Sequence, residues 1–501
     1  MAAILRMHAA REVRHWYSTK EKVEQNRYRP KAETLEGRPV TKRNFCQRTT
    51  ANCTQRQGEA LSGLDRIREA VKRDKSIRLN NLMHHMTIDL LREAYQEQKS
   101  EAAPGIDGVT WEKYGVELET NLSDLRKRVF SGRYRATPSK RVWIPKPDGS
   151  ERPLGIPVLE DKIIQQAVVW ITNQIFEEDF LGFSYGFRPG RSQHNALDAL
   201  SVGITQRKVN WVLDADIQSF FDRVDHEWMM EFIKHRISDP KMLRLIQKWL
   251  RAGVSEQGQW SKTTVGTPQG AVISPLLANI YLHYVLDLWV RKWRETQAQG
   301  DVIFVRYADD FVMGFQHKQE AIRFLGELKE RLAKYKLTLH PDKTRLIEFG
   351  RYAEGNRKKC GEGKPETFDF LGFTHICART RKGNYFTVRR KTIAKRMRNK
   401  IKAVRRELMY RRHDPVPEQG KWIRSVVQGH FNYFAVPNNK RSIDIFRTEV
   451  IRGWFRALRK RSQKARRLTW DRFNRLLETW VPKARILHKY PTQRLRVTYS
   501  R

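Results

Sequence analysis

Two adjacent carboxylates, Asp309 and Asp310, interrupt an apolar stretch that covers residues 302–315. The residues on both sides are mainly β-branched or aromatic, which favours two strands joined by a tight turn. Carboxylates in such a segment lose their hydration at a high cost unless a partner compensates them. The sequence therefore predicts a β-hairpin that presents an acid pair at its turn. The pair faces either a metal ion or, in the simpler alternative, water.

A third carboxylate, Asp216, has a matching setting. It ends the apolar segment 211–217, and two aromatic residues, Phe220 and Phe221, follow it. A strand that ends in an acid, beside a hairpin that carries two more, can bring three carboxylates to one point. Oxygen ligands of this kind suit Mg²⁺. We therefore expect a two-metal site that activates a 3′-hydroxyl and stabilises a leaving pyrophosphate.

The charge of the chain indicates a polyanionic partner. Its 501 residues include 97 Lys and Arg against 55 Asp and Glu, a net charge of +42. Charge of one sign opposes folding by self-repulsion, so nucleic acid is the natural ligand. Residues 391–501 alone hold 31 Lys and Arg against 7 Asp and Glu. The most apolar stretch, 271–286, is too short to span a membrane and is expected to be a buried helix.

The cysteines point to a reducing compartment. They show neither the spacing of a zinc site nor the density of a disulfide scaffold and lie at positions 46, 53, 360 and 377. A cytoplasmic location is therefore the default expectation. The first 20 residues hold four basic residues and one acid, which leaves import into an organelle as a minor alternative.

Length and periodicity predict several domains. Residues 1–62 are polar and basic without periodicity, which indicates a flexible arm. Residues 63–125 have helical patterns, and residues 126–376 mix helices with short strands. Residues 391–470 are helical and basic, and 471–501 form a short basic tail. The expected fold class is α+β, with a small antiparallel sheet and a separate all-α basic domain.

Several elements of the core are predicted from local patterns. We expect a hairpin over 142–156 with an Asp-Gly turn, and short strands at 337–340 and 344–349. Helices are expected over 160–180, 226–252, 271–294 and 317–335, and Ser192 is expected to cap another helix.

Two further features can bind a nucleotide. The loop Gly266-Thr-Pro-Gln-Gly270 allows close approach of its backbone to a ligand, and Gln269 can bond a base, sugar or phosphate. Lys146 and Arg152 flank the turn of the 142–156 hairpin and can close on a triphosphate. Taken singly, each feature is also compatible with an ordinary turn or a solvated basic hairpin.

In combination, the motifs between residues 103 and 376 resemble a reverse transcriptase, and more narrowly the group II intron-encoded type. The motifs that carry this resemblance are Gly105-Ile-Asp-Gly108, Ile144-Pro-Lys-Pro-Asp-Gly149, Arg152-Pro-Leu-Gly-Ile-Pro157, Gly186-Phe-Arg-Pro-Gly-Arg-Ser192, Leu213-Asp-Ala-Asp-Ile-Gln-Ser-Phe-Phe-Asp222, Gly266-Thr-Pro-Gln-Gly-Ala-Val-Ile-Ser-Pro275, Tyr307-Ala-Asp-Asp310, Leu339-His-Pro-Asp-Lys343 and Phe370-Leu-Gly-Phe373.

The resemblance implies a right-hand polymerase with fingers, an antiparallel palm sheet and a thumb. It implies Asp216, Asp309 and Asp310 as ligands of two Mg²⁺ ions, with the backbone carbonyl of Ile217 as an additional ligand. The nucleotide-binding residues that it implies are Lys146, Arg152, Phe221, Gln269 and Tyr307.

Other residues near the implied site have narrower roles. Phe221 matches the bulky side chain that excludes a ribose 2′-hydroxyl, and Phe220 is the competing residue. Arg188 and Arg191 would follow the backbone of the template. Asp214 and Asp222 are expected to form salt bridges rather than to bind metal.

The C-terminal region resembles the maturase-specific domain, which doubles as the thumb. The residues that carry this resemblance are Trp422, Gly429-His-Phe-Asn-Tyr-Phe-Ala-Val-Pro437, Trp454, Leu458-Arg-Lys-Arg-Ser-Gln-Lys464 and Thr469-Trp470. Intron RNA is the implied ligand, with Arg459, Lys460 and Arg461 among its contacts. The alternative is a basic helical domain that grips any duplex.

The predicted function is an RNA-directed DNA polymerase that assists the splicing and mobility of its group II intron. Its expected partners are the intron RNA, an RNA template, a DNA primer or target, and dNTPs, with no membrane. Many relatives continue into an H-N-H endonuclease, whereas this sequence stops at Arg501, so we expect no cleavage of the second DNA strand. The alternatives are a domesticated polymerase in host DNA repair or defence, and an RNA chaperone with a vestigial polymerase.

Overall fold

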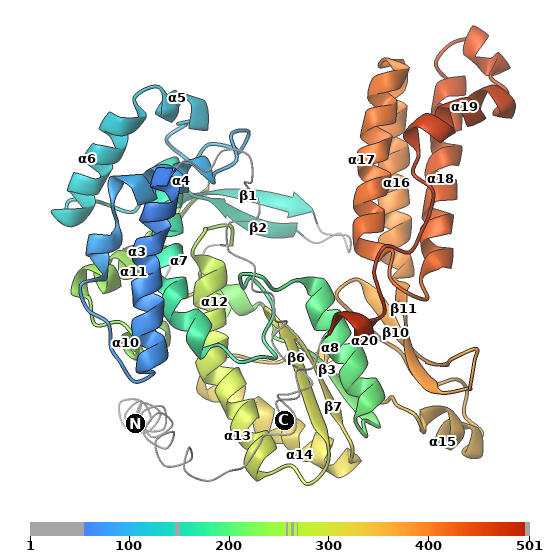
Figure 1. Ribbon diagram of the computed structural model, residues 1–501, viewed down its shortest axis with the longest axis horizontal. Helices are drawn as coiled ribbons and strands as arrows, with labels where there is room; N and C mark the ends of the chain where they lie inside the picture. Colours follow the sequence, from blue (N-terminus) through green and yellow to red (C-terminus); the bar gives the residue numbers. More distant parts are fainter. Residues whose placement is uncertain (1–54, 146–150, 257–258, 262–264, 268, 496–501) are drawn as a thin grey trace.

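The structure is a computed structural model of the chain, and it describes residues 55–145, 151–256, 259–261, 265–267 and 269–495. The chain combines many helices with three small sheets whose strands pair antiparallel except for β1 with β4, in agreement with the predicted mixture of helices and antiparallel strands. Figure 1 shows the N-terminal helices on one side, a sheet in the lower centre and an upright group of C-terminal helices on the other side. Within the described residues, no helix is long and apolar enough to cross a membrane.

The N-terminal helices cover one long central helix. They are α3 (Gln55–Arg73), α4 (Ile88–Gln96), α5 (Trp111–Gly115) and α6 (Leu118–Phe130), and α3 and α4 pack on α7 (Leu159–Asp179). Helix α3 begins eight residues inside the segment that was predicted to be a flexible arm. The prediction is therefore wrong for residues 55–62, and residues 1–54 lie outside the described part of the chain.

The hairpin predicted over residues 142–156 is confirmed in its strands. Strands β1 (Ser139–Pro145) and β2 (Glu151–Ile156) pair antiparallel, and their turn lies outside the described residues. Two short strands that were not predicted, β4 (Val254–Glu256) and β5 (Gln259–Ser261), extend this sheet in the order β2-β1-β4-β5.

The central sheet carries the predicted acid hairpin. Its strands are β3 (Trp211–Asp216), β6 (Val302–Tyr307), β7 (Asp310–Phe315) and β8 (Arg345–Glu348), in the order β6-β7-β3-β8 and antiparallel throughout. Alternate side chains enter two different cores. Phe304 and Met313 belong to the large N-terminal core, whereas Val305 and Val312 pack in a second core with helix α8 (Gln193–Gln206). Both faces of the sheet are therefore buried.

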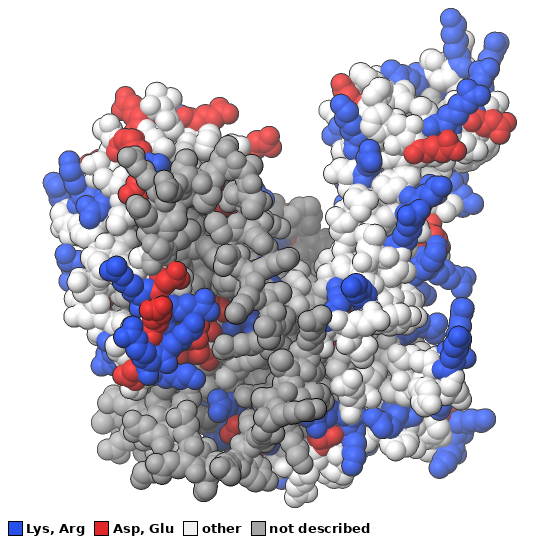
Figure 2. Space-filling view, in the orientation of Figure 1, with Lys and Arg blue, Asp and Glu red and all other residues white. Residues whose placement is uncertain are grey.

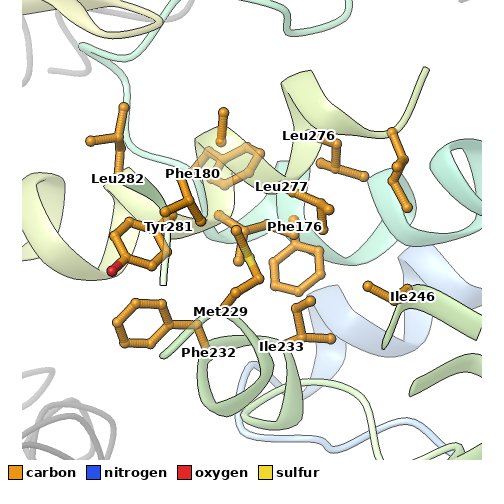
Figure 3. Close-up of a cluster of buried hydrophobic side chains, with 14 of the residues drawn as sticks. Phe176, Phe180, Met229, Phe232, Ile233, Ile246, Leu276, Leu277, Tyr281 and Leu282 are labelled. Atoms are coloured by element: carbon orange, nitrogen blue, oxygen red, sulfur yellow. The ribbon is translucent and has the colours of Figure 1, made fainter. Parts of the chain in front are cut away.

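The large core is built mainly from helices. Figure 3 shows α7, α10 (His226–Lys234), α11 (Pro240–Arg251) and α12 (Ser274–Leu282) meeting around Phe176, Met229 and Leu277. The helical region predicted over 226–252 is confirmed, and it consists of two helices, α10 and α11. Helix α10 ends at Lys234, and helix α11 begins at Pro240. The Asp239 side chain caps α11, because it accepts hydrogen bonds from the backbone amides of Lys241 and Met242. The short helix α9 (Phe220–Arg223) precedes α10.

The predicted buried helix over 271–294 is observed with a local irregularity. Helix α12 passes through a π-helical turn, His283–Asp287, into α13 (Leu288–Thr296). Helix α14 (Lys318–Lys334) then matches its prediction. The strand predicted at 337–340 is wrong, because only Leu339 forms an isolated bridge, with Ile217. Helix α15 (Ala353–Lys359) follows β8.

A third sheet joins the core to the C-terminal helices. Its strands are β9 (Phe368–Phe370), β10 (Phe373–Arg379) and β11 (Phe386–Thr392). The helices α16 (Ala394–Tyr410), α17 (Val416–Phe434), α18 (Lys440–Arg459) and α19 (Trp470–Trp480) then share a separate apolar core.

The predicted tail over 471–501 is wrong as a separate unit. Phe473 of α19 lies in the core of the C-terminal helices. The chain then returns to the central domain, where α20 (Pro491–Arg494) contacts α8, and Leu495 enters the second core. Arg494 pairs there with buried Asp198, which also accepts a hydrogen bond from Arg390 at 3.0 Å. Residues beyond 470 therefore connect the two parts of the molecule.

Candidate active site

The structure brings the three predicted carboxylates together. Asp216 ends β3 directly opposite Asp310, the first residue of β7. Partners in an antiparallel pair have Cα atoms about 4.5–5.5 Å apart. Tyr307 and Asp310 pair across the β6–β7 hairpin, so Ala308 and Asp309 form its turn. Ala308 has a φ of 57°, a left-handed conformation that lets the chain reverse within two residues.

The carboxylates disturb one another electrostatically. Burial raises the pKa of Asp309, and the nearby Asp216 carboxylate adds to the rise. Burial, followed by the charges of Asp309 and Asp216, raises the pKa of Asp310 to about 6, although part of its side chain borders solvent. Like charges this close favour neutralisation by a cation.

Four basic residues oppose these shifts, and one of them, Arg306 of the neighbouring strand β6, lowers the pKa of Asp309. Arg152 of β2 lowers the pKa of Asp309, whereas Arg396 of α16 and Lys343 lower that of Asp310. The acids therefore lie between the β1–β2 hairpin and the base of the C-terminal helices.

The carboxylate set fits a divalent cation by its chemistry, since hard oxygen donors are what Mg²⁺ prefers. In the part of the chain that the structure describes, no three Asp, Glu, His or Cys side chains are already arranged as metal ligands. Lys343 Nζ donates to Asp216 Oδ2 at 2.6 Å. A metal ion that bound Asp216 through Oδ2 would have to displace this ammonium group. Ile217, whose backbone carbonyl is the other predicted ligand, follows Asp216 in the sequence and forms an isolated β-bridge with Leu339.

Two of the predicted nucleotide-binding residues, Arg152 and Gln269, form a chain of hydrogen bonds with Asp222. Arg152 Nε donates to Gln269 Oε1 at 2.7 Å, and Gln269 Nε2 donates to Asp222 Oδ1 at 3.3 Å. Gly266 has a φ of 91°, and a Cβ there would lie 3.0 Å from the carbonyl oxygens of Phe221 and Asp222. Glycine thus lets the 266–270 loop approach helix α9. Lys146 lies outside the described residues.

The two phenylalanines after Asp216 are placed differently. Phe220 is 2% exposed and packs edge-on against Tyr281 in the core. Phe221 is only partly buried, and its carbonyl accepts a bond from Thr267 N at 2.7 Å. Of the two, Phe221 is the side chain that an incoming molecule can reach.

Two acids near the site behave differently from one another. Asp214 lies 3.8 Å from Arg345 in an ion pair, and burial raises its pKa to about 7. The expected salt bridge is therefore present at Asp214. Asp222 is exposed, and the bond that the structure gives it comes from Gln269 rather than from a basic residue.

The placement of Arg188 contradicts its predicted contact with the template. Its side chain is buried, pairs with Glu177 at 3.0 Å and donates to the carbonyls of Leu181 and Ser184. Arg191 likewise donates to the carbonyls of Gly182 and Ser184. These guanidinium groups satisfy the backbone of their own loop, which the sequence could not reveal because Glu177 belongs to the preceding helix.

Three predicted RNA contacts lie at the far end of α18. Arg459 and Lys460 are exposed and Arg461 is partly exposed. Arg459 donates to the carbonyl of Arg466, and Arg461 donates to that of His413. We call these three side chains the α18 basic cluster. They lie apart from the acids of the central sheet.

A buried ionic network supports the catalytic turn, and sequence reasoning missed it. Arg306 of β6 is fully buried and pairs with Asp287 of the π-helical turn at 2.5 Å. It also donates to the carbonyl of Ala308 at 2.9 Å and to Asn279 Oδ1 at 3.0 Å. The signal in the sequence was an arginine within an otherwise apolar strand, and its partner could not be identified without the fold.

Comparison with known proteins agrees with this geometry. The family described as reverse transcriptase (RNA-dependent DNA polymerase) matches residues 144–375. Protein YkfC of Escherichia coli (strain K12) is 37% identical over 310 residues, which cover 54% of this chain and 81% of that protein.

Two further relatives are encoded in introns, as their names state. The group II intron-encoded protein LtrA of Lactococcus lactis subsp. cremoris is 38% identical over 213 residues, which cover 42% of this chain and 35% of LtrA. The putative COX1/OXI3 intron 1 protein of Saccharomyces cerevisiae is 33% identical over 225 residues, which cover 44% of this chain and 27% of that protein. The match thus spans about a third or less of these two relatives.

Clustered carboxylates at the edge of an antiparallel sheet, beside basic groups that can hold phosphates, define an enzyme of phosphoryl or nucleotidyl transfer. The sequence comparisons specify the family. The chain belongs to the reverse transcriptases, the RNA-dependent DNA polymerases.

The Arg306 network generates a stability prediction. Arg306→Met leaves Asp287 buried without its counter-ion and should lower the free energy of unfolding by about 3–5 kcal/mol. Urea unfolding measures this loss. The double variant Arg306→Met/Asp287→Leu removes both charges and should recover most of it. The primer-extension rate of the double variant should stay low, because the carbonyl of Ala308 has lost its donor. Equal unfolding midpoints for the single and double variants would contradict this account.

Proposed function

We propose that this protein is an RNA-directed DNA polymerase that uses two Mg²⁺ ions and dNTPs. The observation that carries the proposal is the pairing of Asp216 with Asp310, with Asp309 in the adjoining turn. In this assignment the central sheet is the palm, and the N-terminal helices with the β1–β2 hairpin form the fingers. The helices α16 to α19 form the thumb. Figure 2 shows these outer parts as two prongs with an open notch between them, which suits a nucleic-acid duplex.

The residues of the chain have separate tasks in this reaction. Asp216, Asp309 and Asp310, with the carbonyl of Ile217, would hold the divalent ions, which polarise the primer hydroxyl and neutralise the triphosphate when bound. Before a metal ion binds, the ammonium group of Lys343 would pair with the Asp216 carboxylate and compensate its charge. Arg152 can give a bidentate contact to the triphosphate. Lys146, which lies outside the described residues, is proposed as a second cation for the triphosphate.

The remaining nucleotide contacts position the sugar and base. Gln269 holds Arg152 through its side chain and fixes β2 through its carbonyl, which accepts from Gly155 N at 2.6 Å. Phe221, accessible beside Asp216, would exclude a ribose 2′-hydroxyl by its bulk. Tyr307 precedes the acid turn and would contact the nucleotide or primer end.

The acid assignment is tested by removing one carboxylate without changing its shape. Asp309→Asn should slow dNTP incorporation on an RNA template by about a thousandfold or more, the effect expected for a lost electrostatic contact to a transition state. Asp65→Asn, which changes an exposed acid on α3, is the matched control and should extend primers normally. Both variants should bind RNA like the unmodified protein. Normal extension by Asp309→Asn would refute the two-metal assignment.

The sugar gate is tested by comparing two neighbouring rings. Phe221→Ala should raise the incorporation of ribonucleotides relative to deoxyribonucleotides, because the clash with the 2′-hydroxyl is removed. Phe220→Leu is the control, since Phe220 packs in the core and its loss should affect stability alone. Steady-state ratios of kcat/KM for rNTP and dNTP measure the effect. A changed ratio in Phe220→Leu and not in Phe221→Ala would reverse the assignment.

We further propose that the protein binds a group II intron RNA and assists its splicing and mobility. Relatives named as intron-encoded proteins support this role. The charge of the C-terminal region supports it as well. In Figure 2, Lys and Arg side chains are distributed over the C-terminal helices and clearly outnumber the acids there. Phosphate neutralisation by such a surface would stabilise the folded intron.

The RNA-binding role is tested at the α18 basic cluster. Arg459→Gln/Lys460→Gln/Arg461→Gln should weaken RNA binding and reduce the slope of log affinity against log salt by about two, because up to three phosphate contacts are lost. Titration of a labelled intron RNA at several salt concentrations measures this slope. Lys358→Gln/Lys359→Gln/Lys364→Gln removes the same charge from the exposed α15 region and should leave the slope closer to its original value. Equal slopes for the two triple variants would place the main contact elsewhere.

A further inference from the structure

An exposed aromatic side chain lies beside the catalytic turn in a conformation that is unfavourable for it. Phe187 has a φ of 56°, in the left-handed region that side chains with a Cβ rarely adopt. Its side chain is also 53% exposed, unlike the other phenylalanines around it. Both features oppose folding, and strain of this kind gathers at functional positions.

The residues on either side of Phe187 are fixed. The carbonyl of Gly186 accepts a bond from Asn279 Nδ2 at 2.7 Å, and a Cβ at Gly186 would lie 2.3 Å from Ala308 N. On the other side, Arg188 is buried and paired with Glu177. The chain is therefore held against the catalytic turn at one neighbour and in the core at the other. The ring between them is directed to the surface.

The ring of Phe187 adjoins the acid hairpin. Its centroid lies 6.4 Å from that of Tyr307, at an interplanar angle of 44°. Tyr307 is the last residue of β6 and pairs with Asp310. The two rings thus form an apolar surface next to the carboxylates that would act on the primer hydroxyl.

We propose that Phe187 contacts the terminal base pairs of the RNA–DNA primer–template duplex and positions the primer end at the acids. This inference rests on the proposed polymerase activity. A polymerase must accept every sequence, and an apolar ring contacts sugars and base edges without a hydrogen-bond code. The hybrid duplex offers a wide, shallow minor groove that such a ring can enter. The rigid attachment of residues 186 and 188 keeps the ring in place for each new base pair.

The test separates the ring from its backbone strain. Phe187→Gly removes the ring and relieves the left-handed conformation, so the thermal unfolding midpoint should stay equal or rise. Its dissociation constant for a labelled DNA primer on an RNA template, measured by fluorescence anisotropy without dNTP, should increase about fivefold, the lower end of an aromatic contact with a base. Phe187→Leu keeps an apolar side chain and should bind more tightly than Phe187→Gly. Tyr352→Ala, which removes an exposed ring at the start of α15, should bind normally.

Two results would overturn the inference. The first is unchanged duplex affinity in Phe187→Gly. The second is weaker affinity that comes with a lower unfolding midpoint and is not restored in Phe187→Leu, since this indicates a purely structural role. If the unmodified protein binds the hybrid and fails to extend it, the polymerase proposal fails instead. The two failures are therefore distinguishable.

Discussion

The pairing register of β3 with β7 is the constraint on which the rest of the site depends. Strand side chains alternate between faces, so a slip of one residue would turn every buried side chain of β7 to the opposite face. Both faces of this sheet are packed against apolar cores, so the slip would exchange the side chains that fill the two cores and disturb their close packing. The same register sets Asp216 opposite Asp310. Arg306 adds the remaining restraint, because it binds the carbonyl of Ala308 and thereby fixes the turn that carries Asp309.

The acids are surrounded by cations that reach them from three separate regions of the chain. Arg152 comes from the β1–β2 hairpin, Lys343 from the loop before β8, and Arg396 from the first turn of α16. Each of these three cations belongs to a different structural element. The charge around the acids can therefore change when one of these elements moves. Lys343 is the clearest case, since its ammonium group bonds directly to Asp216. These cations explain how three crowded carboxylates remain compatible with a folded chain.

Local patterns in the sequence were sufficient for much of this arrangement. The acid hairpin, the β1–β2 strands and the buried helix after residue 271 follow from hydrophobic periodicity and turn residues, which act over short distances. Interactions between distant segments were beyond such patterns. Arg188, which was predicted to contact the template, is instead buried in an ion pair with Glu177, and the buried pair of Arg306 with Asp287 was not predicted at all. Likewise, the residues after 470 looked like a tail because their partners, among them Asp198, lie far away in the chain.

The most direct test of the central claim is the position of the metal ions. Crystals of the protein with an RNA–DNA primer–template, Mn²⁺ and a non-reactive dNTP analogue would show the ions by anomalous scattering. We expect two peaks about 3.5–4 Å apart, each in contact with carboxylate oxygens of Asp216, Asp309 or Asp310, and Lys343 displaced from Asp216. Peaks bound elsewhere, with the Lys343–Asp216 pair intact, would contradict the account.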